Sequence, residues 1–260
     1  MSDAPDAPGT RPAASAADHP VRPARPHHKL TDDGRRMREV LTYSRRGNRF
    51  TPRQQQAWDR YADAWWVPDE RVDRPGFSVA GLFGREAPLV VEIGSGVGEA
   101  TAALAATRPD HDVLAFEVWR PGVADTLARL ADAGLTNVRL LSVDAVWSFE
   151  HLLAPGSLAG LWTFFPDPWH KKRHHKRRLV TPEFARLAAT RLRPGATWRL
   201  ATDWADYAEQ IEAVLDAEPL LDGGVTERWA ERPLTRFERK GLAAGRTITD
   251  LAYRRAAGAG

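Results

Sequence analysis

The chain has 260 residues, of which 43% are hydrophobic, and its formal net charge at pH 7 is only +3. That length fits one α/β domain with extensions or two small domains, and so mild a charge does not by itself indicate a nucleic-acid partner. Cysteine is absent, which excludes disulfides and thiolate metal sites. No apolar stretch approaches the roughly 18 residues that span a bilayer, and the N-terminus has no apolar signal segment. We therefore expect a cytoplasmic protein without a membrane segment.

The first 28 residues are rich in proline and alanine and have almost no large apolar side chain. Such a segment cannot bury enough surface to offset its ordering entropy, so residues 1–28 are predicted to be disordered. Residues 29–60 form a polar, basic segment, in which Thr51 and Pro52 are typical of a helix N-cap and first helical position. Residues 61–260 are predicted to form the main folded domain.

From about residue 88 onward, apolar runs alternate with helical patterns. Buried strands are predicted at PLVVEIG, VLAFEVW, NVRLLSVDA, LAGLWTFFPDP and TWRLATDW, and helices at residues 98–106, 121–133, 181–192 and 205–217. Strands that alternate with helices in this way indicate an α/β fold, with a mostly parallel twisted sheet and helices on both faces. The C-terminal tail offers one or two late strands around an irregular loop. Ligands of such sheets bind at the carboxyl ends of the strands.

A glycine-rich turn follows the first of these strands. The strand ends in Glu92, and Gly94, Gly96 and Gly98 come directly after it. Glycines let the backbone turn tightly and approach a ligand at the next helix N-terminus, although a plain strand-to-helix turn has the same pattern. A dinucleotide fingerprint would place another glycine at position 99, where this chain has glutamate, and this disfavours an oxidoreductase.

Acidic residues end the first three strands, namely Glu92, Glu117 and Asp144. Glu117 can accept hydrogen bonds from both hydroxyls of a ribose, and Asp144 is placed to accept from an adenine amino group. A single acid could be a solvated loop residue, but three at successive strand ends indicate one pocket. An acid before the glycine loop favours a cationic cofactor over a pyrophosphate. The arrangement resembles the class I methyltransferases, which have a Rossmann-like fold and bind S-adenosylmethionine.

The fourth strand runs into FFPDPWHKKRHHKRR, residues 164–178. Prolines on both sides of Asp167 fix φ, so its carboxylate is expected on a stiff backbone, either at a functional site or in a rigid surface turn. Six lysines and arginines follow between residues 171 and 178 with no acid among them. Beside a pocket this run favours a phosphate-binding platform over a merely solvated face.

Three histidines lie within the same run, at positions 170, 174 and 175. Residues 170 and 174 have helical spacing, so a zinc site is conceivable. The neighbouring cations disfavour a dication, and neither a carboxylate pair nor a thiolate supports one. The sequence therefore predicts no metal.

The run closely resembles the PDPW-x-K-x-RH-x-KRR signature of the bacterial tRNA (guanine-N7)-methyltransferases. ATDW at residues 201–204 and TRFE at residues 235–238 match two later segments of that family, in the same order. The resemblance covers most of the chain beyond about residue 40. It implies methyl transfer from S-adenosylmethionine to N7 of a guanine in tRNA, guanine 46 of the variable loop in the family, which forms 7-methylguanosine.

The resemblance also implies roles for individual residues. Asp167 is the expected catalytic residue. The expected cofactor contacts are Glu92, Gly94, Gly96, Gly98, Glu117 and Asp144. The expected substrate contacts are Lys171, Asp203, Thr235, Arg236, Phe237 and Glu238. The expected tRNA-binding stretch is Arg173, His174, His175, Lys176, Arg177 and Arg178. The expected partner is tRNA, with no obligatory protein partner.

N7 of guanine carries a lone pair and no proton, so its methylation requires no general base. Asp167 is expected to stabilise the positive charge that grows on the purine, with Asp203 as the alternative. Trp169 or Phe237 could stack on the base or pack in the core. Two other functions stay open: a class I methyltransferase for another RNA or non-RNA substrate, and a non-catalytic RNA-binding protein. The basic run argues against a non-RNA substrate, and the intact acids argue against a silent protein.

Overall fold

The computed structural model describes residues 29–30, 36–37, 42–43 and 47–257. The predicted disordered segment, residues 1–28, lies outside the described residues. Within the predicted basic segment, β1 (Lys29–Leu30) and β2 (Arg36–Met37) pair as short antiparallel strands. No helix in the described ranges is long and apolar enough to cross a membrane.

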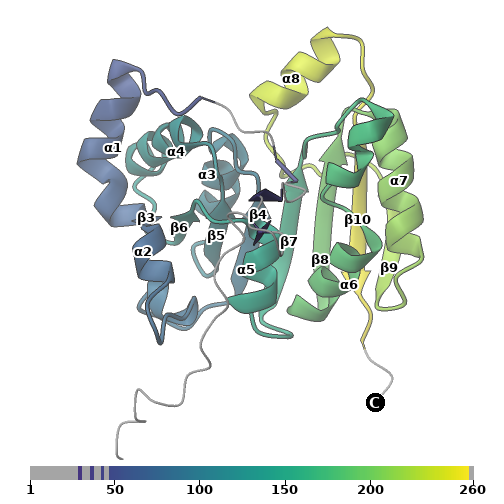
Figure 1. The fold of residues 1–260 in the computed structure, drawn as a ribbon, viewed down its shortest axis with the longest axis horizontal. Helices are drawn as coiled ribbons and strands as arrows, with labels where there is room; N and C mark the ends of the chain where they lie inside the picture. The colour runs from purple at the N-terminus through teal and green to yellow at the C-terminus, as the bar shows by residue number, and fades with distance from the viewer. Residues whose placement is uncertain (1–28, 31–35, 38–41, 44–46, 258–260) are drawn as a thin grey trace, which may run out of the picture.

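An eight-stranded sheet forms the centre of the molecule (Figure 1). Its strands are β3 (Trp66–Val67), β4 (Leu89–Ile93), β5 (Asp112–Phe116), β6 (Val138–Leu141), β7 (Leu158–Phe164), β8 (Leu192–Thr202), β9 (Leu221–Thr226) and β10 (Thr249–Arg255). Their order is β3-β6-β5-β4-β7-β8-β10-β9, with all pairs from β3 to β8 parallel and β10 antiparallel to both neighbours. The predicted mostly parallel sheet is confirmed, and its order reverses between β4 and β7, where such sheets bind ligands.

Helices cover both faces of the sheet, as predicted (Figure 1). One face shares a hydrophobic cluster with α1 (Pro52–Trp65), α3 (Glu99–Ala106) and α4 (Arg120–Asp132), and the other with α5 (Ala145–His151), α6 (Pro182–Arg191) and α7 (Ala205–Asp216). The strands alternate between these clusters, since Val90 belongs to the first and Val91 to the second. This alternation is the period of two that a strand buried on both faces requires.

The predicted helices agree with α3, α4, α6 and α7 to within one residue at each end. Local capping chemistry explains the agreement: Thr181 caps α6 by accepting a hydrogen bond from the Phe184 amide, and proline follows it at the first helical position. The short α2 (Asp69–Val72), α5 and α8 (Arg236–Ala243) were not predicted. Helix α8 lies in the tail, where the sequence predicted an irregular loop. Its residues are mostly polar, so no apolar pattern indicated a helix there.

Helix α1 begins at the predicted N-cap. Thr51 accepts a hydrogen bond from the Gln54 amide while the Gln54 side chain accepts one from the Thr51 amide, which is a capping box. Gln54 also donates to Asp125 and to the Pro121 carbonyl on α4. These contacts hold α1, which spans the predicted domain boundary at residue 61, against α4.

Candidate active site

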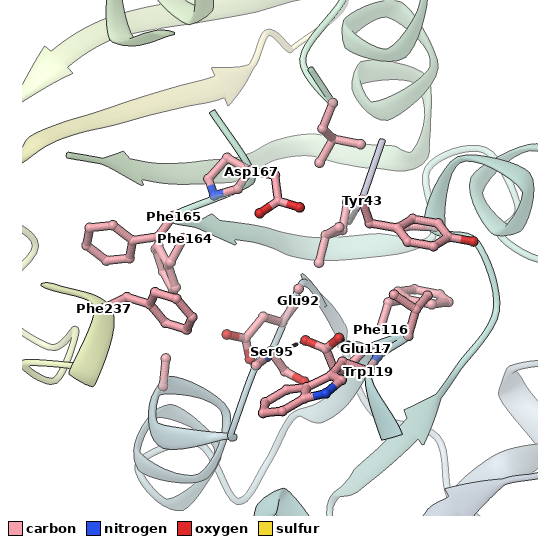
Figure 2. A pocket seen from close by; sticks show the side chains of 18 of the residues that line it. Tyr43, Glu92, Ser95, Phe116, Glu117, Trp119, Phe164, Phe165, Asp167 and Phe237 are labelled. Atoms are coloured by element: carbon pink, nitrogen blue, oxygen red, sulfur yellow. Dashed lines mark hydrogen bonds between the residues drawn. The ribbon is translucent and has the colours of Figure 1, made fainter. Parts of the chain in front are cut away.

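A pocket opens where β4, β5 and β7 end, at the reversal of strand order (Figure 2). Many of the predicted site residues line it, namely Glu92, Gly94, Gly96, Glu117, Asp167, Thr235 and Phe237. Two residues of the N-terminal segment, Thr42 and Tyr43, complete the lining. The pocket is thus assembled from segments that are far apart in the sequence.

The glycine turn needs its glycines for conformation and for space. Gly94, Gly96 and Gly98 have φ of 79°, 61° and 77°, in the left-handed region that side chains rarely adopt. Gly122 in α4 approaches from the other side, and a Cβ there would lie 2.2 Å from the Gly96 carbonyl oxygen. Gly122 was not among the predicted site residues, although a glycine in the first turn after Pro121 marks such a close approach.

Glu92 is a buried acid in this pocket, with 2% of its surface exposed. The Thr101 hydroxyl donates a hydrogen bond to it at 2.5 Å. The pKa of Glu92 is raised to about 7, chiefly because the carboxyl is buried; the hydrogen bond from Thr101 opposes this rise, and the nearby Glu117 adds to it. A cationic ligand would favour the ionised form of this carboxyl.

Glu117 is held in a fixed orientation by the backbone. One carboxylate oxygen accepts from the Gly96 amide at 2.7 Å and the other from the Trp119 amide at 2.8 Å. A carboxylate has about four acceptor sites, which suits a group that holds several donors at once. Asp144 caps α5 by accepting from the Trp147 amide at 2.9 Å, and its neighbours Val143 and Ala145 line the pocket. Asp144 itself is therefore at the rim.

Asp167 faces the pocket from a constrained loop (Figure 2). The aromatic residues Phe165 and Trp169 on either side of it have φ of 53° and 49°, a conformation that costs non-glycine residues energy. The Phe165 amide donates to the Ala201 carbonyl at 2.7 Å, and the Pro168 carbonyl accepts from Arg178 at 2.9 Å. The loop is thus fixed at both ends as well as by its prolines.

Arg178 belongs to the predicted tRNA-binding stretch, but its side chain is inside the fold, with 2% of it exposed. Besides the Pro168 carbonyl it contacts three residues of α7: it pairs with Asp206 at 2.7 Å, donates to Gln210 at 2.7 Å and lies over the Tyr207 ring. The sequence has no acid within this run, so no local ion pair was expected. Asp206 pairs with Arg178 from 28 positions away, which proximity in sequence could not reveal.

The other cations of the basic run differ in how far their side chains are exposed. Arg177 is half-buried, lies 3.6 Å from the Trp169 ring centre and donates to the Tyr43 carbonyl. The exposed cations are Lys171, Lys172, Arg173 and Lys176. Among the histidines, His170 packs on Trp204, and burial together with the surrounding cations lowers the pKa of His174. No cluster able to hold a metal ion is present among the residues that the structure describes.

The TRFE segment forms the start of α8, and some of its residues line the pocket while others support the helix. Thr235 caps the helix, and Thr235 and Phe237 line the pocket. Glu238, predicted as a substrate contact, is 1% exposed and pairs with Arg228 and Arg232. Its carboxylate therefore fixes α8 to the rest of the fold through these ion pairs and does not line the pocket.

Two further acids fix the surroundings of α8. Glu99 accepts hydrogen bonds from the Arg236 amide and from Arg239, which joins α8 to the start of α3. Asp203, another predicted substrate contact, accepts from Arg246 at 2.8 Å. Neither Asp203 nor Lys171 lines the pocket, so both lie around it.

The fold and the acidic pocket at its switch point define a class I methyltransferase. A family model described as "Putative methyltransferase" matches residues 86–251. A curated tRNA (guanine-N(7)-)-methyltransferase from Nocardioides sp. is 78% identical over 90% of this chain and 95% of its own, and one from Cutibacterium acnes is 49% identical over 84% of each. The chain belongs to the tRNA (guanine-N(7)-)-methyltransferase family.

Solved structures share the fold at low sequence identity. The 16S rRNA methyltransferase KamB superposes with a TM-score of 0.51 at 20% identity, covering 69% of this chain and 94% of that one. A structure described as an antibiotic-related methyltransferase gives 0.51 at 15% identity, over 73% of this chain and 96% of that one. These likenesses confirm the predicted class I fold.

The buried position of Glu92 predicts a dependence of stability on pH. Because its pKa rises from 4.5 to about 7 on folding, ionising it opposes folding, and stability falls as pH rises between those values. Glu92→Gln should therefore be more stable than the unaltered protein at pH 8, by about 3 kcal/mol at most, and the difference should shrink at pH 5. Urea unfolding of the ligand-free proteins measures it, with exposed Glu86→Gln as the control. A pH-independent difference would contradict the burial argument.

The contacts of Arg178 predict that it acts on the fold rather than on RNA directly. Arg178→Gln should lower the unfolding free energy by roughly 2 kcal/mol and reduce turnover, because the Pro168 carbonyl and Asp206 are left without their donor. Exposed Lys176→Gln is the matched variant and should weaken tRNA binding without reducing stability. Chemical unfolding and titration with tRNA at several salt concentrations separate the two. Unchanged stability in Arg178→Gln would refute the assignment.

Proposed function

We propose that this protein transfers the methyl group of S-adenosylmethionine to N7 of guanine 46 in tRNA, in the cytoplasm. The observation that supports it most is the position of Asp167. Its carboxylate lies on a fixed loop, in the same pocket as Glu92 and Glu117, and the exposed cations of the basic run follow directly. Family membership supports the reaction, and the structure supplies the residues for it.

The pocket residues fit the methyl donor. Glu92 and Glu117 offer acids to an amino group and a ribose, and the glycine turn lets the backbone approach. The Ser95 hydroxyl is buried at the pocket wall and has no hydrogen-bond partner among the described residues. A buried hydroxyl without a partner costs stability, so a polar ligand that satisfies it gains affinity. S-adenosylmethionine supplies an electrophilic methyl group on a sulfonium.

The enzyme's residues need to position the guanine and stabilise charge, since N7 attacks with its own lone pair. The purine becomes cationic as N7 is alkylated. A carboxylate fixed before the reaction stabilises that charge without reorganising, and the Asp167 loop provides such a group. Its oxygens can also accept hydrogen bonds from the N1–H and N2 amino edge of guanine.

Phe237 is the better of the two candidates for stacking on the base. It lines the pocket, and a Cβ placed on Gly96 would lie 3.5 Å from the Cε2 atom of its ring. Trp169 instead packs on Arg177 and donates to the Thr42 carbonyl, so it holds the basic run against the N-terminal segment. The exposed cations Lys171, Lys172, Arg173 and Lys176 would contact the phosphates of the tRNA.

The proposed role of Asp167 predicts that Asp167→Asn lowers turnover about 10²- to 10³-fold, as expected on removal of a fixed group that stabilises transition-state charge. Cofactor affinity and thermal stability should stay close to those of the unaltered protein. The measurement uses labelled S-adenosylmethionine and an unmodified tRNA transcript, followed by digestion and identification of the nucleoside. Near-normal turnover would remove Asp167 from the mechanism.

The same assay tests the substrate. The unaltered protein should form 7-methylguanosine in the transcript and none in a transcript with adenine at position 46. If 7-methylguanosine still forms in the altered transcript, guanine 46 is not the target, although the proposed reaction at N7 of guanine is retained. Absence of 7-methylguanosine from both would reject the proposed function.

A further inference from the structure

A second hollow lies on the sheet face that carries α3 and α4, towards the amino ends of β7 and β8. Its volume is about 460 Å³, and none of its lining residues is shared with the active-site pocket. The walls include Trp162 and Trp229 together with four arginines. We call it the arginine groove and define it by Arg108, Arg193, Arg199, Arg254, Trp162 and Trp229.

An irregularity in strand pairing builds the arginine groove. Leu158 of β7 pairs with Leu192 of β8, but the next pair is Gly160 with Thr197. Four residues of β8 therefore stand opposite one residue of β7, and they bulge outwards. Gly195 within the bulge has a φ of 81°, which favours glycine. Bulges of this kind commonly occur next to functional sites, and this one lines the groove.

The charge of the groove is strongly positive. Its lining holds four arginines and a single acid, Glu231, which pairs with Arg108. Among the described residues, Arg193, Arg199 and Arg254 have no carboxylate partner, and Arg254 donates only to the Gly195 carbonyl. Glu231 and Asp250 act on Arg199 without pairing with it. Three guanidinium groups that lack an ion-pair partner among the described residues, around one hollow, favour an anionic ligand.

Arg199 gives the clearest indication of what that ligand is. Its guanidinium lies 4.4 Å from the Trp229 ring centre, is half-buried, and makes no hydrogen bond or ion pair with any described residue. Such a group has five N–H donors, and partial burial without acceptors is costly. A phosphate offers acceptors in the paired geometry that a guanidinium fork matches.

The tryptophans of the groove indicate whether it would bind a nucleic-acid base or a phosphate backbone. Arg199 and Arg108 both lie over Trp229, and Arg108 also lies over Trp162. Guanidinium groups thus already occupy the indole faces on which a base would stack. The groove therefore presents hydrogen-bond donors rather than stacking surfaces.

We propose that the arginine groove binds the phosphodiester backbone of the same tRNA whose guanine enters the active site. This inference rests on the proposed function. The groove lies near the amino ends of the strands whose carboxyl ends form the pocket, and the seven residues of β7 span roughly 20 Å. One tRNA is large enough to reach both. Phosphate contacts at this distance position a substrate without reading its sequence.

The test uses the full-length chain with Arg193→Gln, Arg199→Gln and the double variant. Arg186→Gln is the matched control, because Arg186 is exposed on α6, on the other face of the sheet. The Kd and KM for tRNA should rise roughly tenfold in the double variant, and the log–log salt slope should fall by about one for each phosphate that is no longer neutralised. The kcat at saturating tRNA and the cofactor Kd should remain unchanged, as should all values for the control.

An unaltered tRNA affinity and salt slope in the double variant would overturn the proposal. So would a change in binding of inorganic phosphate without any change for tRNA, since the groove would then hold a small anion. If Arg199→Gln does not fold, the single variant Arg193→Gln provides the test, because the Arg193 side chain is exposed and its replacement should not disturb folding. Weakened tRNA binding in these variants, with no 7-methylguanosine formed by the unaltered protein, would support the groove and reject the proposed reaction.

Discussion

The buried guanidinium of Arg178 is the interaction on which the active site depends. It joins the Pro168 carbonyl, in the loop that carries Asp167, to Asp206 and Gln210 of α7. The loop leaves β7 through residues in a left-handed conformation, which would relax unless the surrounding structure held them. A cation that is hydrogen-bonded along its whole fork is suited to this, because it satisfies a carbonyl and a carboxylate at once. The basic run thus begins with exposed cations and ends in a buried arginine that supports the loop of Asp167.

A second buried network performs the corresponding task for the opposite wall of the pocket. Arg232 pairs with both Glu238 and Asp250, which joins α8 to β10 beneath the surface. Through it the cap residue Thr235 and the ring of Phe237 are presented to the pocket. The residues of one short segment therefore divide between ligand contact and support, although they are adjacent in sequence.

Features set by local chemistry were predictable from the sequence. The Thr51 cap and the need for glycine at Gly94, Gly96 and Gly98 depend on neighbouring residues, and the structure agrees with both. The third strand is an exception, since β6 ends at Leu141 and the predicted strand end, Asp144, caps α5 instead. Partnerships across the fold were not predictable. Arg178 and Glu238 have the residue types of surface ligands, and only the approach of α7 and of Arg232 determines that they are buried. The groove beside β8 was missed for the same reason, since its arginines are dispersed along the chain.

The charges of the molecule are arranged with opposite signs at the two places that a tRNA would meet. The pocket has the acids Glu92, Glu117 and Asp167, while the exposed part of the basic run and the arginine groove lie outside it. Screening at physiological salt extends over about 8 Å, which is shorter than a strand of seven residues, so the field of the arginine groove acts separately from that of the pocket. Under the proposed function, the exposed cations attract phosphates to the rim, and the carboxylates of Glu117 and Asp167 disfavour them inside the pocket. A neutral base experiences no such repulsion, and in the proposed reaction Asp167 stabilises the base as alkylation makes it cationic, so the same charges that exclude the backbone would also favour the reaction.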